Sequence, residues 1–315
     1  MSTSTAPRAT TVSPLVYVAI GVTILAWASA FIVVRSTAPH FTPGALALAR
    51  LIVGSVLLTP LLLRHRWVAP TRREWLLLTG FGALWFGGYS IVLNLAEQTL
   101  DAGTTAMIVN IAPIMIALGA GVLLGEGLPK WLLIGTGVAF IGVVLIGLGS
   151  GGSVVGAGIG VLWALVAALT YTAGVLFQKP VLGRLPNAQV VWIGAVIGML
   201  VCTPFTGELI AGVQTAPVEG LLGAVWLGAV PTALGYTTWS YALSRMPAGQ
   251  LGVSTYIVPP VTIVLSLILF AEVPAVLAIV GGAVALVGVA LSRRRPAAPV
   301  EPQERVPETA GSVPR

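Results

Sequence analysis

The sequence predicts an all-α integral membrane protein of ten transmembrane helices, built as two inverted-topology five-helix repeats. Three observations predict this fold: the composition, ten long apolar stretches and an internal repeat. Hydrophobic residues make up 57% of the 315 residues and charged residues only 8%, whereas soluble domains carry about 25% charged residues. Because so few charges cannot cover a water-facing surface, most of the surface must face lipid.

Each of the ten stretches is long and apolar enough to cross a bilayer, which takes about 20 residues. The connections between them are short, so we expect neighbouring helices to be antiparallel. The stretches run near 14–34, 43–63, 74–94, 102–125, 129–148, 156–177, 189–206, 217–243, 248–270 and 274–291.

These stretches divide the chain into two repeats, 14–149 and 156–292, joined by a linker at 150–155. The remaining segments, 1–13 and 293–315, lack apolar periodicity. The second of them is rich in Pro, Glu and Arg. We therefore expect both to be disordered tails.

The Lys and Arg residues gather in alternate connections. With the N-terminus in the cytoplasm, all of the 16 Lys and Arg residues except Arg35 and Arg50 fall in the tails or the inner connections. Inner loops of membrane proteins carry such an excess. We therefore expect a multi-pass protein of the cytoplasmic membrane with both termini inside. The net charge of +6 then reflects topology, and without a basic stripe interleaved with aromatic residues we expect no nucleic-acid partner.

The two halves of the chain are similar to each other. A shift of 144 residues places Trp27 on Tyr171 and Arg35 on Lys179. A shift of 146 gives the pairs Ala102-Gly103 and Ala248-Gly249, Pro113 and Pro259, Glu126 and Glu272, Gly135 and Gly281, and Gly142 and Gly288. Because each half has five helices, the second half must be inverted relative to the first. Inverted repeats are typical of secondary transporters, although a gene duplication kept only for packing would leave the same pattern.

The order of these motifs resembles the drug/metabolite transporter superfamily, EamA type. Each repeat of that family carries a small-residue segment, a mid-helix proline and a small residue followed by Glu at a helix end. Here they read Ala102-Gly103-Thr104-Thr105-Ala106, Pro113 and Gly125-Glu126, then Ala248-Gly249-Gln250, Pro259 and Ala271-Glu272. The family's aromatic residue in the first helix of a repeat matches Trp27 and Tyr171, and its Arg in the second helix matches Arg50. The second half has no counterpart of Arg50.

The resemblance implies a central cavity between the helices, and polar or aromatic side chains in those helices are candidates to line it. Buried polar groups are costly in hydrocarbon and therefore mark candidate sites. The candidates for the substrate pathway are Trp27, Arg50, Tyr89, Asn110, Tyr171, Tyr236, Trp239 and Tyr256. Any one of the aromatic residues has packing as its alternative role.

Arg50 lies about 10 Å into its helix at 1.5 Å per residue. We favour a structural pair with Asp101 or Glu97, while contact with a substrate carboxylate and snorkelling to the interface remain alternatives. Asn110 either binds substrate or joins two helices.

Pro113 and Pro259 interrupt their helices and free a backbone carbonyl. They are candidate hinges, with a simple packing kink as the alternative. Glu126 and Glu272 end their helices, where they cap neighbouring helices or bind protons. Because no Asp or Glu lies near mid-membrane, the sequence favours facilitated transport over proton coupling.

The residues indicate a secondary transporter that moves small metabolites or amino acids by alternating access, and the resemblance implies export. The expected partners are a small-molecule substrate and the lipid bilayer, with a homodimer left open. We expect no cofactor and no metal: a glycine-rich segment at 147–152 joins two apolar stretches rather than a strand and a helix, and no Cys/His cluster has ligand spacing. The alternatives are a membrane-embedded enzyme, for which clustered His, Asp or Glu are missing, and a non-transporting scaffold.

Overall fold

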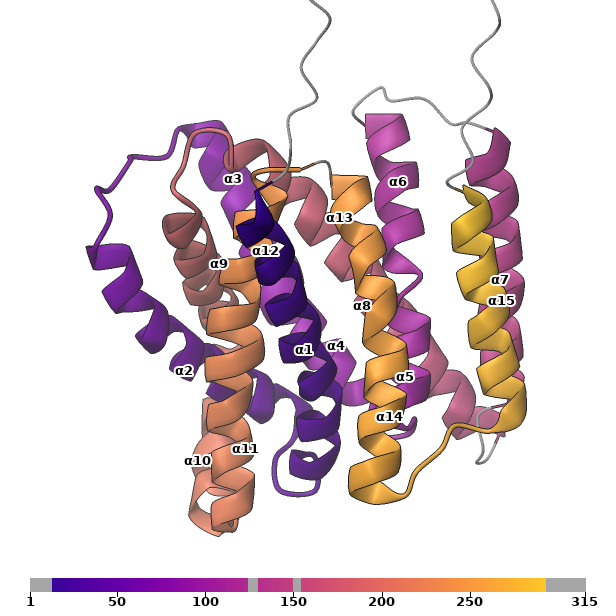
Figure 1. The fold of residues 1–315 in the computed structure, drawn as a ribbon. Helices are drawn as coiled ribbons and strands as arrows, with labels where there is room; N and C mark the ends of the chain where they lie inside the picture. The colour runs from indigo at the N-terminus through magenta and orange to yellow at the C-terminus, as the bar shows by residue number, and fades with distance from the viewer. Residues whose placement is uncertain (1–12, 124–129, 150–153, 247, 293–315) are drawn as a thin grey trace, which may run out of the picture.

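The computed structural model describes residues 13–123, 130–149, 154–246 and 248–292, and in these ranges the protein is entirely helical (Figure 1). The all-α prediction is confirmed. The first half contains α1 (Pro14–Thr37), α2 (Pro43–Leu63), α3 (Arg72–Phe81), the π-helix η1 (Gly82–Gly88), α4 (Tyr89–Ala96), α5 (Ala102–Val109), α6 (Ala112–Leu123) and α7 (Lys130–Gly149).

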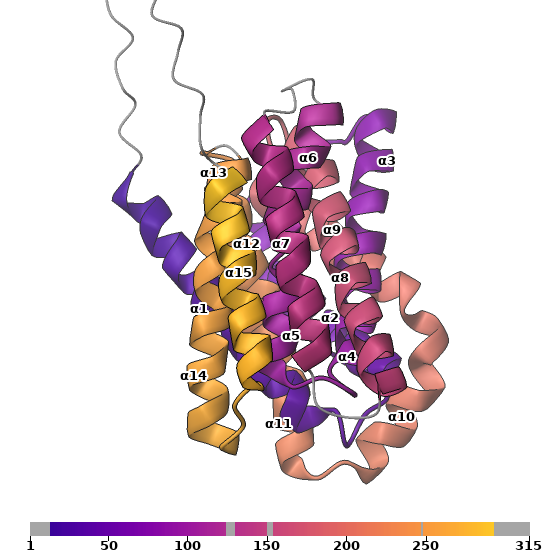
Figure 2. The same cartoon turned by 90° about the vertical axis from the view of Figure 1, so that its right-hand side faces the viewer.

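The second half has one helix interrupted by a π-helix and two interrupted by 3₁₀ turns. Its elements are α8 (Val154–Val181), α9 (Asn187–Val201), the 3₁₀ turn η2 (Thr203–Phe205), α10 (Thr206–Thr215), α11 (Val218–Leu227), the π-helix η3 (Gly228–Gly235), α12 (Tyr236–Leu243), α13 (Ala248–Ser254), the 3₁₀ turn η4 (Thr255–Ile257), α14 (Val258–Phe270) and α15 (Val276–Ser292). The start of α1 and the end of α15 lie at the same end of the bundle in both views (Figures 1 and 2), as an even number of crossings requires.

Local sequence chemistry places several helix starts. Thr42 and Asp101 cap α2 and α5 by accepting hydrogen bonds from the main-chain N–H groups of Ala45 and Thr104. Thr71 and Glu74 form a reciprocal capping box at the start of α3. Such caps satisfy N–H groups that have no partner within the helix.

The described residues do not contain ten unbroken membrane-spanning helices. Five helices are long and apolar enough to cross a membrane, or six if the bent pair α9 and α10 is one span. Four shorter apolar helices cover Ala102–Ile116, Leu133–Ile146, Thr255–Phe270 and Val276–Gly288. The number of crossings therefore stays a prediction.

The seventh predicted stretch ends differently from expectation. We expected it to end at Thr206, but α9 ends at Val201 and the chain continues through η2 into α10, bent by 53°. Pro204 lies inside η2, and a proline inside a helix lacks an N–H donor and kinks or breaks the helix.

The two π-helices occupy matching places in the two halves. Gly82, the first residue of η1, falls on Gly228, the first residue of η3, under the 146-residue shift. A π-turn inserts an extra residue into a helix and is frequent at functional sites. Both π-helices lie in helices that surround the aromatic core described below.

Helices α7 and α15 pack against each other along one edge of the molecule (Figures 1 and 2). A Cβ atom on Gly142 would lie 2.5 Å from the carbonyl oxygen of Gly281, and one on Gly288 would lie 2.6 Å from that of Gly135. The two contacts exchange under the 146-residue shift, which is the pattern of a two-fold axis between the helices. Glycine is required here because the two backbones touch.

Candidate substrate site

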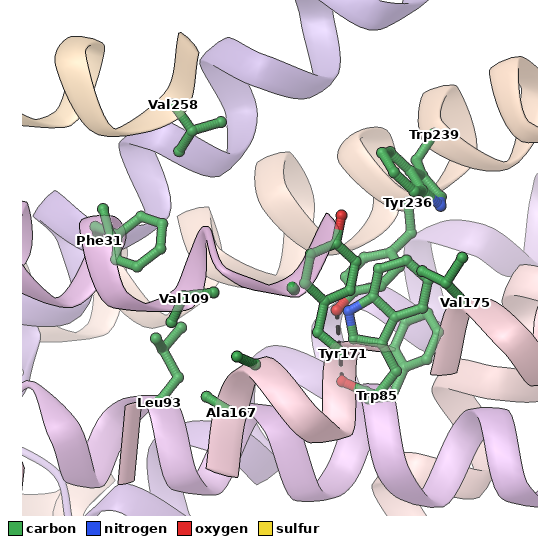
Figure 3. Packing of buried hydrophobic residues seen from close by; sticks show 14 of the residues in the cluster. Phe31, Trp85, Leu93, Val109, Ala167, Tyr171, Val175, Tyr236, Trp239 and Val258 are labelled. Atoms are coloured by element: carbon green, nitrogen blue, oxygen red, sulfur yellow. Dashed lines mark hydrogen bonds between the residues drawn. The ribbon is translucent and has the colours of Figure 1, made fainter. Parts of the chain in front are cut away.

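A cluster of aromatic rings fills the centre of the bundle. The indole of Trp27 on α1 lies 5.0–6.1 Å, between ring centroids, from the rings of four residues on three other elements. They are Trp85 on η1, Tyr171 on α8, and Tyr236 and Trp239 on α12. Figure 3 shows the last four converging, with the hydroxyl of Tyr236 donating to the main-chain oxygen of Trp85 at 3.5 Å.

Two glycines allow this close packing. A Cβ atom on Gly235 would lie 2.9 Å from Nε1 of Trp27, and one on Gly174 would collide with the side chain of Trp85. The cluster therefore depends on small residues at the contact points as well as on the rings. Edge-to-face contacts of this kind stabilise aromatic pairs by about 0.5–1.5 kcal/mol beyond the area that they bury.

Arg50 lies beside this cluster and is 2% exposed. Its Nε donates to Oγ1 of Thr232 on η3 at 3.1 Å, and the Thr232 hydroxyl donates in turn to the main-chain oxygen of Leu227 at 2.7 Å. The Nη1 atom of Arg50 is buried and has no hydrogen-bond partner in the described part of the chain. A buried guanidinium with a free donor can accept an anion as its hydrogen-bond partner.

The predicted structural pair between Arg50 and an acid is wrong for this conformation, since no ion pair joins Arg50 to Asp101 or Glu97. The oxygens of Asp101 accept from the N–H and the hydroxyl of Thr104, at 2.8 and 2.6 Å. Asp101 is therefore held at the start of α5 by its capping role. Glu97 is buried nearby with neither carboxyl oxygen hydrogen-bonded.

A cavity of about 40 Å³ lies between Arg50 and the rings. Six of the eight residues predicted for the substrate pathway line it: Trp27, Arg50, Tyr89, Asn110, Tyr171 and Tyr236. Trp239 stacks on Trp27 behind the lining, and Tyr256 lies apart, against a small cluster of Ile114 and Ala139. Sites for drug-sized ligands have volumes of about 300–1,000 Å³, so this conformation is contracted around the site.

The lining also contains residues outside those eight, among them Trp85, Pro231 and Thr255. The repeat offers a signal for two of them, because Trp85 falls on Pro231 under the 146-residue shift.

The helix break at Asn110 brings a polar group to the cavity. Asn110 ends α5, its Nδ2 donates to the main-chain oxygen of Ala106 at 3.2 Å, and its Oδ1 accepts from the hydroxyl of Thr255 at 3.3 Å. The break was predicted from Pro113, which lies in the first turn of α6, and the matching Pro259 follows the 3₁₀ turn η4. The helices are interrupted next to both prolines, and the role of these prolines as hinges stays a prediction.

A second cavity, of about 350 Å³, separates α5 and α14 from the α7–α15 pair. Its lining is aliphatic apart from Asn110, which also lines the first cavity. Asn110 therefore stands between a polar aromatic site and an apolar space.

Glu272, one of the two carboxylates predicted at the repeat ends, is paired with an arginine. Glu272 accepts a hydrogen bond from Nη2 of Arg35 through its Oε1 at 3.1 Å, while its Oε2 is buried without a partner. Glu126 lies outside the described residues. Lys179 is the counterpart of Arg35 in the second half. It donates to the main-chain oxygens of Leu243 and Met246, at 2.6 and 2.9 Å.

Comparison with known proteins covers almost the whole chain. The model of the EamA-like transporter family matches residues 14–148 and 158–294. The chain belongs to the EamA-like transporter family. The resemblance read from the repeated motifs is confirmed, and the protein is a multi-pass membrane protein of a transporter family.

Relatives of this EamA-like protein have names that concern transport. It is 33% identical, over 88% of its length and 93% of the relative, to a probable terminal-alkyne amino-acid exporter of Streptantibioticus cattleyicolor. It is 32% identical, over 84% of its length and 86% of the relative, to the uncharacterized transporter YdfC of Bacillus subtilis. A probable amino-acid metabolite efflux pump of Salmonella typhimurium is 25% identical over 79% of this chain and 85% of the relative.

A solved crystal structure shares the fold with a TM-score of 0.61, covering 88% of this chain and 97% of the other. The sequence identity is 19%, so this likeness concerns the fold alone.

Proposed function

We propose that this protein is a secondary transporter that exports small carboxylate-bearing metabolites of the amino-acid type across the cytoplasmic membrane. The observation that carries the proposal is the free Nη1 donor of Arg50, buried at the edge of an aromatic cavity. A carboxylate supplies the acceptor that this donor lacks, and the planar guanidinium suits two parallel hydrogen bonds. The names of two relatives, an amino-acid exporter and an amino-acid metabolite efflux pump, support the same substrate class.

The aromatic rings are suited to the rest of such a substrate. Trp27, Tyr171 and Tyr236 offer flat apolar faces, and Tyr89 and Asn110 add polar atoms to the same lining. A charged group held at Arg50 would therefore leave its hydrocarbon part against the rings. An amphipathic metabolite fits this division better than an inorganic anion or a hydrocarbon does.

Alternating access is the mechanism that the internal symmetry favours. The contacts between α7 and α15 exchange under the repeat shift, and so do two contacts at opposite ends of the bundle. Arg35 donates to the main-chain oxygen of Glu97 at 3.4 Å, while Lys179 donates to that of Leu243. Halves that make equivalent contacts can exchange conformations, which opens the site to one side at a time.

Efflux of L-propargylglycine, an amino acid with a terminal alkyne, from loaded proteoliposomes tests the proposal. Released substrate is measured by coupling its alkyne to a fluorescent azide. We expect efflux well above that of protein-free liposomes. Arg50→Lys should reduce it about tenfold, since a hydrogen bond to a charged group contributes about 1.5–3 kcal/mol.

Arg184→Lys is the matched control, because Arg184 is exposed and binds Glu74 and the main-chain oxygen of Ala69 far from the cavity. It should transport like the wild type. A membrane-embedded enzyme or a scaffold would move nothing: no efflux of propargylglycine or of any standard amino acid above the protein-free level refutes the proposed substrate class.

A further inference from the structure

Glu97 is a buried carboxyl group at the end of α4. It follows α4 directly, its residue is 0% exposed, and both of its side-chain oxygens lack a hydrogen-bond partner among the described residues. An ionised carboxylate in such a place loses its hydration without compensation, whereas the neutral acid loses much less. Burial accordingly raises the pKa of the Glu97 carboxyl well above its usual range.

The charged side chains around Glu97 do not compensate the negative charge of an ionised Glu97 carboxylate. Arg35 is the charge that most favours the ionised form of Glu97, but its guanidinium binds the main-chain oxygen of Glu97 and the carboxylate of Glu272 instead of the Glu97 carboxyl. Asp101 and Glu272 oppose a further negative charge, and Arg50 favours it weakly. Glu272 is paired with Arg35, and Asp101 accepts hydrogen bonds from Thr104. Among the described residues, the Glu97 carboxyl has no such partner.

Glu97 is also close in the chain to the candidate substrate site. Leu93, one turn earlier on α4, lines the cavity, as does Arg50 on α2. The free donor of Arg50 and the free acceptors of Glu97 have opposite charge but are not paired with each other. An anion bound at Arg50 would cancel the attraction that Arg50 exerts on an ionised Glu97.

We propose that Glu97 is a proton-binding site, and that a proton on Glu97 and a substrate carboxylate at Arg50 bind cooperatively. The part that concerns substrate rests on the proposed function, while proton binding stands without it. The proton comes from water at the end of the bundle where Arg35 and Glu272 are about one-third exposed. It adds to one carboxylate oxygen, and it returns to water when a conformational change exposes Glu97 and the acid ionises.

A proton site at Glu97 differs from the expectation drawn from the sequence, which favoured facilitated transport because no acid lies at mid-membrane. An acid at a helix end can serve when packing removes it from water. The reciprocal nature of linkage means that substrate binding then takes up a proton and that acid pH tightens substrate binding.

Infrared titration of the purified protein tests proton occupancy without any substrate. We expect the carbonyl stretch of a protonated carboxyl at pH 7 in the wild type, its loss in Glu97→Gln and its retention in Glu97→Asp. Glu219→Gln is the control, because Glu219 is an exposed carboxylate in the first turn of α11. No such band in the wild type, or a band that survives in Glu97→Gln, overturns the proposal.

The same titration tests the link with Arg50. Arg50→Gln removes the positive charge, so the pH at which the band disappears should rise. An unchanged midpoint overturns the cooperative part. Neither measurement depends on which metabolite is transported, so their failure is distinguishable from a failure of the efflux assay.

Transport supplies the final readout, with L-propargylglycine as substrate and a pH-sensitive dye inside the liposomes. The wild type should move protons with the amino acid. Glu97→Gln should lose the dye signal to the protein-free level while retaining exchange of labelled for unlabelled propargylglycine, which also shows that the variant is folded. Proton movement that persists in Glu97→Gln overturns the assignment.

Discussion

Replacing Arg50 by Met should stabilise the protein and strongly reduce transport, and these opposite signs distinguish a binding group from a structural one. The guanidinium is 2% exposed, makes one hydrogen bond through Nε to Thr232, and leaves Nη1 without a partner. Removing one partner of a satisfied buried group is destabilising, whereas replacing an uncompensated buried charge by an apolar side chain of similar length removes its desolvation cost.

The magnitude follows from two opposing terms. The hydrogen bond from Nε to Thr232 contributes about 1.5–3 kcal/mol, and it is lost. Burial of a charge that is not fully paired costs several kcal/mol, and that cost disappears. The Thr232 hydroxyl keeps its own acceptor, the main-chain oxygen of Leu227, so the substitution leaves no new donor unpaired. We expect a net stabilisation of about 1–3 kcal/mol.

Thermal unfolding in detergent and efflux of propargylglycine from proteoliposomes measure the two effects in parallel. Arg50→Met should raise the melting temperature and lower efflux about 10- to 150-fold, the equivalent of losing about 1.5–3 kcal/mol of substrate binding. Thr232→Val serves as the comparison, because it keeps the charge and removes the acceptor of Nε, and should lower the melting temperature. An Arg50→Met protein that is less stable than the wild type and still transports would refute the reasoning and make Arg50 structural.

Two further predictions concern packing. Trp27→Phe should reduce efflux because Trp27 contacts four rings of the central cluster, while Trp226→Phe, at a side chain 46% exposed, should transport normally; equal efflux of the two variants would assign Trp27 to packing alone. Gly142→Ala should lower the melting temperature by the equivalent of about 1–3 kcal/mol, because its new Cβ meets the backbone of Gly281 and Ala285. Gly137→Ala on the same helix meets nothing within 4 Å and should be neutral or slightly stabilising, so a loss of stability in both variants would contradict the close packing of α7 with α15.

The sequence predicts the helical class and much of the site because its repeat encodes both. Trp27 and Tyr171 fall on each other under the repeat shift, and their rings lie 6.0 Å apart in the structure. Arg50 was identified from the cost of its charge, but its partner was not, because Thr232 comes from a π-helix of the other half. The shape of such an irregular turn depends on packing, and apolar periodicity does not reveal it.

Glu97 shows the same limit more clearly. At the end of an apolar stretch it reads as an interfacial acid, and such residues are usually solvated. Its burial depends on the chain folding back from α4 into α5 and on neighbours from other helices. A single sequence contains no local signal for those contacts.

The symmetry of the frame contrasts with the asymmetry of the chemistry inside it. Under the repeat shifts Arg50 falls on Gly194 and Glu97 falls on Leu243. An arginine at position 194 would have no room, since even a Cβ there would lie 2.5 Å from the ring of Phe81. The second half instead supplies rings and a hydroxyl, with Tyr171, Tyr236 and Thr232 facing Arg50 or its cavity. In the proposed mechanism, equivalent backbones would exchange conformations while the single charge of Arg50 would hold the substrate in one orientation, which a fully symmetric site could not do.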